Sequence, residues 1–247
     1  MRLTVIGCGD AFGSGGRFNT CFMIEAGGRT VLLDCGASTP VALKQRNIDI
    51  NVVDGVILSH LHGDHFGALP FLMLEWQFHA RRERPLTIAG PPGTRERLNA
   101  AMEVYFPRSS KNEWRFPYEV AEIPPGVPDE VLGFAIRTAE VIHQSGAPST
   151  AVRLTQGGKV LTYSGDTEWT DALIPIADGA DLFVIECYDH SRNVPGHMNF
   201  QTLKEKRPLF RAGRIMITHM NPTMLAKVDE ARREGFVVAE DGMAVEV

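Results

Sequence analysis

The chain has 247 residues, of which 44% are apolar and 22% are charged, and its formal net charge is -5. This composition is typical of a globular protein and excludes a disordered chain, and no run approaches the roughly 18 apolar residues of a membrane helix. The negative charge gives no general attraction to a polyanion, since nucleic-acid affinity needs clustered Lys and Arg. Residues 1–7 are too short and strand-like for a signal peptide, and the 4 cysteines show no CxxC pairing, so we expect a cytoplasmic protein that contacts no membrane.

The first half of the chain is predicted to begin with a strand at residues 3–9, followed by a hairpin and then by alternating strands and helices. Apolar runs at residues 20–25 and 29–33 form the hairpin, because Ala26-Gly27-Gly28 between them is a tight-turn sequence. The spacing of apolar residues then predicts strands at 54–58 and 86–90 and helices at 40–47, 66–79 and 94–106. Residues 107–133 contain five prolines, and we expect strands there joined by loops that cover the site.

Strands dominate the second half of the chain. We expect strands at residues 134–142, 150–155, 159–163, 181–186 and 214–218, helices at 171–177, 199–212 and 224–234, and two terminal strands. Two groups of strands separated by helices predict an α/β fold, a four-layer αββα sandwich of two mixed β-sheets flanked by helices. No linker or change in composition divides the chain, so residues 1–247 are expected to form a single domain.

The strand at 54–58 leads into a turn that is rich in metal-binding side chains. Within six residues the turn carries His60, His62, Asp64 and His65. His60 and His62 are two residues apart and can point the same way, whereas Asp64 and His65 leave the turn toward a second point, so two metal ions would fit. Imidazole and carboxylate ligands suit zinc, and also manganese or iron, and the lack of Cys argues against a closed structural zinc site.

This turn resembles the His-x-His-x-Asp-His signature of the metallo-β-lactamase superfamily, and the resemblance covers nearly the whole chain. It implies the metallo-β-lactamase fold and further ligands at strand ends, which match His143, Asp166 and His219. The implied ligand sets are His60, His62 and His143 for one divalent ion, and Asp64, His65 and His219 for the other. Asp166 is expected to bridge both ions, because a carboxylate has two oxygens. The resemblance also makes Asp34 a residue that orients a metal-ligating His.

The stretch from Glu186 to His197 indicates which type of bond is hydrolysed. It resembles the phosphodiesterase branch of the superfamily, the tRNA 3′-processing endonucleases and their relatives, in which a loop His paired with an acid protonates the leaving alkoxide. We therefore expect a dinuclear metal-dependent hydrolase that cleaves small or cyclic anionic phosphodiesters through a metal-bridging hydroxide. The candidate catalytic residues are Asp64, Glu186 and His197, although His197 could instead cap a helix that starts at Asn199. Monomer and homodimer both stay open.

Other branches of the superfamily fit this sequence less well. The 22 residues between His143 and Asp166 leave no room for the arm with which bacterial endonucleases grip tRNA, so nucleic-acid cleavage is disfavoured. Diiron oxygen reductases carry Glu at the position of His62. Thioester hydrolases share the ligand set, but a thiolate leaves without a proton donor, which makes the pair of Glu186 and His197 unnecessary. A metal-stabilised carrier without catalytic activity is also possible.

Overall fold

Two facing sheets of seven strands each form the centre of the computed structural model, which describes residues 1–247 apart from the side chain of Ser110. The first sheet contains, in spatial order, β14 (Ala244–Glu246), β1 (Arg2–Gly7), β2 (Cys21–Ala26), β3 (Arg29–Leu33), β4 (Gly55–Ile57), β5 (Leu86–Gly90) and β6 (Tyr118–Glu122). The second contains β13 (Val237–Val238), β12 (Arg214–Thr218), β11 (Leu182–Glu186), β10 (Lys159–Tyr163), β9 (Thr150–Gln156), β8 (Phe134–Glu140) and β7 (Asp129–Val131).

Both sheets are mixed, with antiparallel strands on one side and parallel strands on the other. Strands β14 to β3 pair antiparallel and β3 to β6 pair parallel. In the second sheet β7 to β10 pair antiparallel and β10 to β13 pair parallel. The β2–β3 hairpin turns at Gly27 and Gly28, whose φ angles of 58° and 75° suit glycine because a two-residue hairpin turn needs positive φ.

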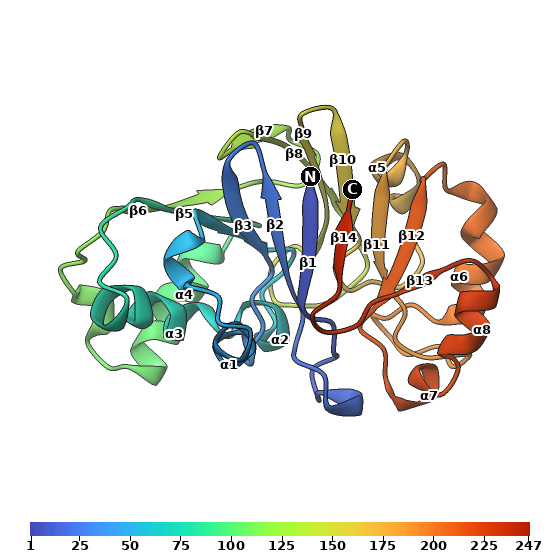
Figure 1. Ribbon diagram of the computed structural model, residues 1–247, viewed down its shortest axis with the longest axis horizontal. Coiled ribbons are helices and arrows are strands. Elements are labelled where there is room, and N and C mark those ends of the chain that lie inside the picture. Colours follow the sequence, from blue (N-terminus) through green and yellow to red (C-terminus); the bar gives the residue numbers. More distant parts are fainter.

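Helices cover the outer face of each sheet (Figure 1). The helices beside the first sheet are α1 (Thr39–Gln45), α2 (Gly63–Phe66), α3 (Leu69–Leu74) and α4 (Thr94–Tyr105), and those beside the second are α5 (Leu173–Ala177), α6 (Phe200–Lys206), α7 (Pro222–Leu225) and α8 (Val228–Arg233). Single turns of other helix types are η1 (Ser14–Gly16), η2 (Ile50–Val52), η3 (Glu75–His79), η4 (Ser109–Lys111) and η5 (Arg207–Leu209). Among the described residues, no helix has the length and apolar character needed to cross a membrane.

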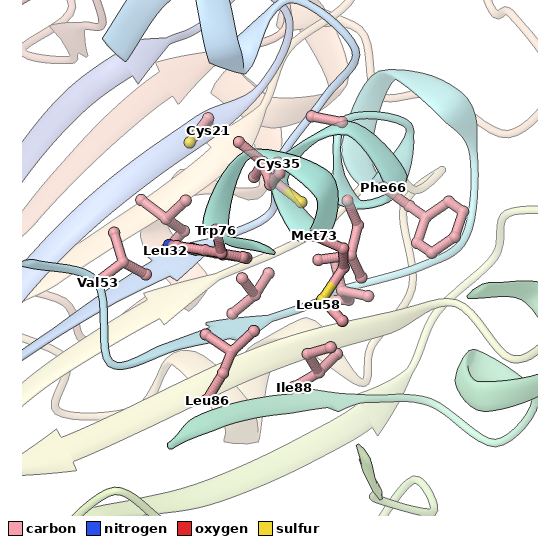
Figure 2. Packing of buried hydrophobic residues seen from close by; sticks show 14 of the residues in the cluster. Cys21, Leu32, Cys35, Val53, Leu58, Phe66, Met73, Trp76, Leu86 and Ile88 are labelled. Atoms are coloured by element: carbon pink, nitrogen blue, oxygen red, sulfur yellow. The ribbon is translucent and has the colours of Figure 1, made fainter. Parts of the chain in front are cut away.

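Three apolar layers hold these four layers of backbone together. The central layer fills the space between the sheets and includes Phe22, Phe134 and Leu154. Between the first sheet and its helices, Trp76 and Met73 pack near Leu32, Leu86 and Ile88, as Figure 2 shows. A third layer, around Phe183 and Phe200, lies between the second sheet and its helices. The predicted four-layer α/β sandwich is therefore confirmed.

Two predictions about helices were wrong. The helix expected at residues 199–212 ends at Lys206, where the chain tightens into η5 because Pro208 has no N–H for an α-helical bond. The helix expected at 224–234 is two helices, and the first begins at Pro222 because Asn221 caps the N–H groups of Thr223 and Met224. Strands β6 and β7 lie within residues 107–133, as expected, and each is at the outer edge of its sheet.

Candidate metal centre

The residues predicted to bind metal follow strands that end at the same side of the two sheets. His60 follows β4, His143 follows β8, Asp166 follows β10 and His219 follows β12. In an α/β fold, residues just beyond the carboxyl ends of neighbouring strands meet in one crevice. Four segments that are far apart in the sequence therefore contribute to one cluster.

The turn after β4 is shaped so that its side chains diverge to two points. His60 lies between β4 and α2, and His62 precedes the first turn of α2 with extended φ and ψ of −75° and 154°. Asp64 and His65 lie within α2 itself. His60 and His65 are completely buried, which is unusual for groups that can carry charge and points to partners inside the cluster.

The first candidate group consists of His60, His62 and His143. Each residue offers a ring nitrogen, and these nitrogens all lie within 4.8 Å of one another. The Nε2 atom of His143 approaches Nδ1 of His62 to 2.9 Å. The Nε2 atom of His60 is buried and has no hydrogen-bond partner among the described residues, so a ligand would be needed to satisfy it.

The second candidate group consists of Asp64, His65, Asp166 and His219, whose donor atoms also lie within 4.8 Å of one another. The Oδ2 atom of Asp166 is 3.2 Å from Nε2 of His65 and 3.2 Å from Nε2 of His219. The Oδ2 atom of Asp64 is 3.3 Å from the same nitrogen of His65. The Oδ1 atom of Asp166 is buried without a hydrogen-bond partner in the described part of the chain, so this carboxylate has an oxygen left for a second ligand.

Four of the five histidines in the two candidate groups have their Nδ1 atom held by a partner outside these groups, so that Nε2 faces the cluster. The partners are Ser59 Oγ for His60 (3.0 Å), Asp34 Oδ2 for His65 (2.8 Å), the Gly196 carbonyl for His143 (2.8 Å) and Thr20 Oγ1 for His219 (3.3 Å). Such contacts fix the tautomer and the orientation of a metal-ligating ring. This arrangement is what a preformed metal site requires.

Asp34 acts on two of these rings. It contacts His65 directly and accepts hydrogen bonds from both the N–H and the hydroxyl of Ser59, each at 2.7 Å, and the Ser59 hydroxyl in turn accepts from His60. The backbone of Asp34 has a φ of 58°, a left-handed conformation that non-glycine residues rarely adopt and that tends to occur at functional sites. Sequence reasoning assigned no role to Ser59 or Thr20, because neither is part of the His-x-His-x-Asp-His pattern itself and only the folded chain shows which rings they contact.

Burial and electrostatic coupling together set the charges of the groups in the cluster. Burial opposes ionisation of Asp64 and Asp166, but the histidines around them outweigh it and hold the pKa of both carboxyls well below the usual range. Burial lowers the pKa of His60, His143 and His219, which favours the neutral imidazole that a metal needs. Burial also opposes protonation of His65, but Asp166, Asp64 and Asp34 outweigh it and raise the pKa of this imidazole. Ionised carboxylates, three imidazoles that favour the neutral form and buried atoms without partners together fit divalent metal ions of the zinc type.

His197 lies beside the cluster and is paired with a buried acid. Its Nδ1 atom is 3.2 Å from Oε1 of Glu186, which ends β11 and is completely buried. Burial opposes protonation of His197, but its hydrogen bond to Glu186 outweighs this and raises the pKa of the imidazole. The ring of Tyr188 stacks on that of His197 with centroids 4.6 Å apart. The expectation that His197 could cap α6 is wrong, because Asn199 caps this helix.

Two cavities share His197, Glu168 and Pro195 in their lining. One of about 360 Å³ is lined by the side chains of the candidate centre, including His62, His143 and Glu168. The other, of about 280 Å³, is lined by residues that include Glu168, Trp169 and Asn193. No Lys or Arg lines either cavity in the part of the chain that the structure describes. The space next to the candidate centre is thus small, and histidines are the only basic side chains among its described lining residues.

The loop that carries His197 is held in place by Asp189. Its carboxylate is buried and accepts hydrogen bonds from the backbone of Ser191, the backbone and guanidinium of Arg192, and the side chains of Asn221 and Thr223. Burial opposes ionisation, but the hydrogen bonds from Arg192 outweigh it and hold the pKa of Asp189 well below its usual range. Asp189 therefore ties the start of the loop to α7.

Asp189→Asn is expected to lower the free energy of unfolding by about 2–4 kcal/mol near neutral pH, because several charge-assisted hydrogen bonds are lost. The folded-state pKa of Asp189 lies below the unfolded value of about 3.9, so its contribution is complete above that value and is lost as the pH falls below it. Urea denaturation of both proteins at about pH 7 and about pH 3 measures the effect. The difference in unfolding free energy between wild type and variant should be smaller at the lower pH. An equal difference at the two pH values would count against this role of Asp189.

Comparisons with known proteins agree with the fold and identify a family for the chain. A family model described as "Anti-Pycsar protein Apyc1" matches residues 1–242. The probable metallo-hydrolase YhfI of Bacillus subtilis is 27% identical over 228 residues, which cover 89% of this chain and 87% of that protein. Ribonuclease Z of Mycobacterium marinum is 26% identical over 253 residues, which cover 94% of this chain and 91% of that protein.

Solved structures show the same architecture. The crystal structure of YhfI from Bacillus subtilis, a metallo-β-lactamase fold protein, matches with a TM-score of 0.80 and 25% identity over 99% of each chain. The short form of human tRNase Z matches with a TM-score of 0.81 and 24% identity, over 100% of this chain and 99% of that one. The predicted metallo-β-lactamase fold and the predicted likeness to tRNA 3′-processing endonucleases are therefore both confirmed.

Proposed function

Since this chain belongs to the Anti-Pycsar protein Apyc1 family and has the metallo-β-lactamase fold, we propose that it is a dinuclear metal-dependent hydrolase of small or cyclic phosphodiesters. Its relatives include a probable metallo-hydrolase and ribonucleases Z, which supports a metal-dependent hydrolase. Phosphodiesters are the proposed substrates because two groups of His and Asp side chains converge beside a histidine that is paired with a buried acid.

We assign the ligands according to the two groups. His60, His62 and His143 hold one ion, Asp64, His65 and His219 hold the other, and Asp166 reaches both. The free Oδ1 of Asp166 supports the bridging role, because Oδ2 already faces the second group. Zinc is the proposed metal because imidazole and carboxylate donors suit it, although manganese and iron accept the same donors.

The chemistry divides between the metal ions and the protein. When bound, the ions lower the pKa of a water toward 7 and neutralise charge on the phosphoryl oxygens. Asp64 and Asp166 stay ionised, as their lowered pKa values require. When the bond between phosphorus and the leaving oxygen breaks, Nε2 of His197 gives its proton to that oxygen, while Glu186 holds Nδ1 and stabilises the ring in its protonated form.

The size and charge of the cavities support a small substrate. Volumes of about 360 Å³ and 280 Å³ suit a small diester. A polynucleotide would need a track of cations along its backbone, and no Lys or Arg lines these cavities among the described residues. Cleavage of a tRNA precursor is therefore less well supported, even though ribonucleases Z are relatives.

Two alternatives can be distinguished from a phosphodiesterase. A thioester hydrolase would differ in its leaving group, and a metal-stabilised carrier would differ in having no turnover. The thioester hydrolase would use the same ligands but would not need a proton donor, because a thiolate is a good leaving group. The carrier would bind two ions and hydrolyse no ester. The pairing of His197 with Glu186 supports the phosphodiesterase over both. A cytoplasmic location, a single domain and the choice between monomer and homodimer stay predictions from the sequence.

The test is a comparison of substrates at known metal content. The zinc-loaded protein is assayed with bis-p-nitrophenyl phosphate, a cyclic mononucleotide, an acyl thioester and a precursor tRNA. Hydrolysis of the first two, with little of the others, is expected. A preference for the thioester or the tRNA would refute the proposal in favour of that branch, and two bound ions without turnover of any ester would favour the carrier.

A further inference from the structure

The backbone of Gly196 connects Glu168 with His143. Its N–H donates to Oε1 of Glu168 at 2.8 Å, and its carbonyl accepts the Nδ1 hydrogen of His143 at 2.8 Å. The next residue along the chain is His197. A single residue therefore lies between a carboxylate, a proposed metal ligand and the proposed proton donor.

This approach of backbone to imidazole leaves no room for a side chain at position 196. Gly196 has a φ of 81°, and a Cβ atom there would lie 2.9 Å from Nδ1 of His143. A real Cβ atom at that distance would push the ring or the loop away. The loop consequently depends on a glycine and on an outside group that holds the glycine against His143.

Glu168 is itself fixed to the strand ends around the site. Its N–H donates to the carbonyl of Ile142, just before His143, at 3.1 Å. Its own carbonyl accepts the hydroxyl hydrogen of Thr167 at 2.6 Å, and the N–H of Thr167 donates to Glu186. The side chain is half-buried and faces both cavities. Glu168 can therefore hold the more exposed loop that carries Gly196 and His197 in a fixed position.

We propose that Glu168 is a positioning residue, which holds the Gly196 backbone so that His143 is oriented for its metal ion and His197 for proton donation. The inference rests on the proposed function and adds a residue to it. A freed loop would withdraw the carbonyl from His143 and let His197 drift. Loss of such an outer contact typically weakens metal binding about 10–100-fold, and a misplacement of about 1 Å costs about 10²-fold in rate.

The test compares Glu168→Ala with Glu168→Gln, which keeps an oxygen at the Oε1 position. Zinc affinity is measured by competition with a chelator, and kcat and KM are measured for diesters with p-nitrophenol or an alkyl alcohol as leaving group. For Glu168→Ala we expect zinc binding about 10-fold weaker and kcat lower by about 10–100-fold on the alkyl diester, with a smaller loss on the p-nitrophenyl diester. Glu168→Gln should stay within about 3-fold of wild type, because its amide oxygen still accepts from Gly196.

Glu122→Ala is the matched control. Oε1 of Glu122 also accepts a backbone N–H, that of Arg95 at 2.9 Å, but it does so at the start of α4. This variant should leave zinc affinity and the dependence on the leaving group unchanged. The comparison shows whether the effect comes from losing any hydrogen bond between a backbone N–H and a carboxylate, or specifically from losing the bond between Gly196 and Glu168.

Three results would overturn the role of Glu168. They are an Ala variant with wild-type zinc affinity and kcat, a Gln variant as impaired as the Ala variant, and an effect confined to KM, which would make Glu168 a substrate-binding group. A wild-type protein that cleaves no diester would refute the proposed function instead. The zinc measurement would then still decide whether Glu168 positions His143.

Discussion

Asp166→Ala is expected to lose metal and activity together. Its carboxylate lies within 3.2 Å of both His65 and His219 and still has a free buried oxygen, so the variant removes a ligand that both ions are proposed to share. Metal content should fall from about two ions per chain to one or none. We expect kcat/KM for bis-p-nitrophenyl phosphate to fall at least about 10³-fold, which corresponds to roughly 4 kcal/mol. Metal analysis by mass spectrometry and initial rates on the same sample measure both.

Asp171→Ala is the control for this experiment. Asp171 is exposed, follows the same strand and accepts a hydrogen bond from the indole of Trp169 at 3.2 Å. Its replacement should change neither metal content nor rate. Circular dichroism would check that the Asp166 variant is folded. A folded Asp166→Ala protein with two ions and the wild-type rate would rule out the bridging role.

His197→Ala should behave differently, because it is expected to keep both ions and lose turnover. His197 offers a ring nitrogen within 4.8 Å of donor atoms of His143 and Asp166, but it belongs to neither proposed ligand set and is held by Glu186. General acid catalysis typically contributes about 10²–10⁴-fold, so the loss on a diester with an alkyl leaving group should be of that order. The loss on a p-nitrophenyl diester should be much smaller, since p-nitrophenolate leaves without a proton. A series of leaving groups of increasing pKa measures the difference.

His190→Ala is the matched histidine control in the same loop. His190 lies 3.1 Å from Glu230 and stacks on Phe200, so its contacts face α6 and α8. Wild-type dependence on the leaving group is expected for this variant. If His197→Ala turned over good and poor leaving groups at undiminished rates, proton donation by His197 would have to be abandoned.

Strand and hairpin positions followed closely from local sequence, whereas several helix ends did not. The glycine pair after Ala26 sets the hairpin turn, and β5 at Leu86–Gly90 lies where the apolar run predicts it. Helix ends depend on single competing groups. The side chain of Asn221 starts α7 earlier than apolar spacing indicates, because a cap decides where a helix begins. The spacing of apolar residues alone does not show where such a cap starts a helix.

The candidate ligands could be predicted because they stand in a dense motif or directly after strands. His60 to His65 form the motif, and His143, Asp166 and His219 follow apolar runs in an order that the family resemblance supplies. The groups that orient them could not be predicted in the same way. Ser59, Thr20 and Glu168 contact the ligands or their loop through space, and polar residues of this kind are common in any turn.

Anomalous X-ray diffraction from crystals of the zinc-loaded protein would test the two-metal centre most directly. Two peaks about 3.5–4 Å apart are expected. One should lie among His60, His62 and His143, and the other among Asp64, His65 and His219, with Asp166 reaching both. Zinc bound only elsewhere on the protein at full loading, with both groups empty, would contradict the existence of this centre.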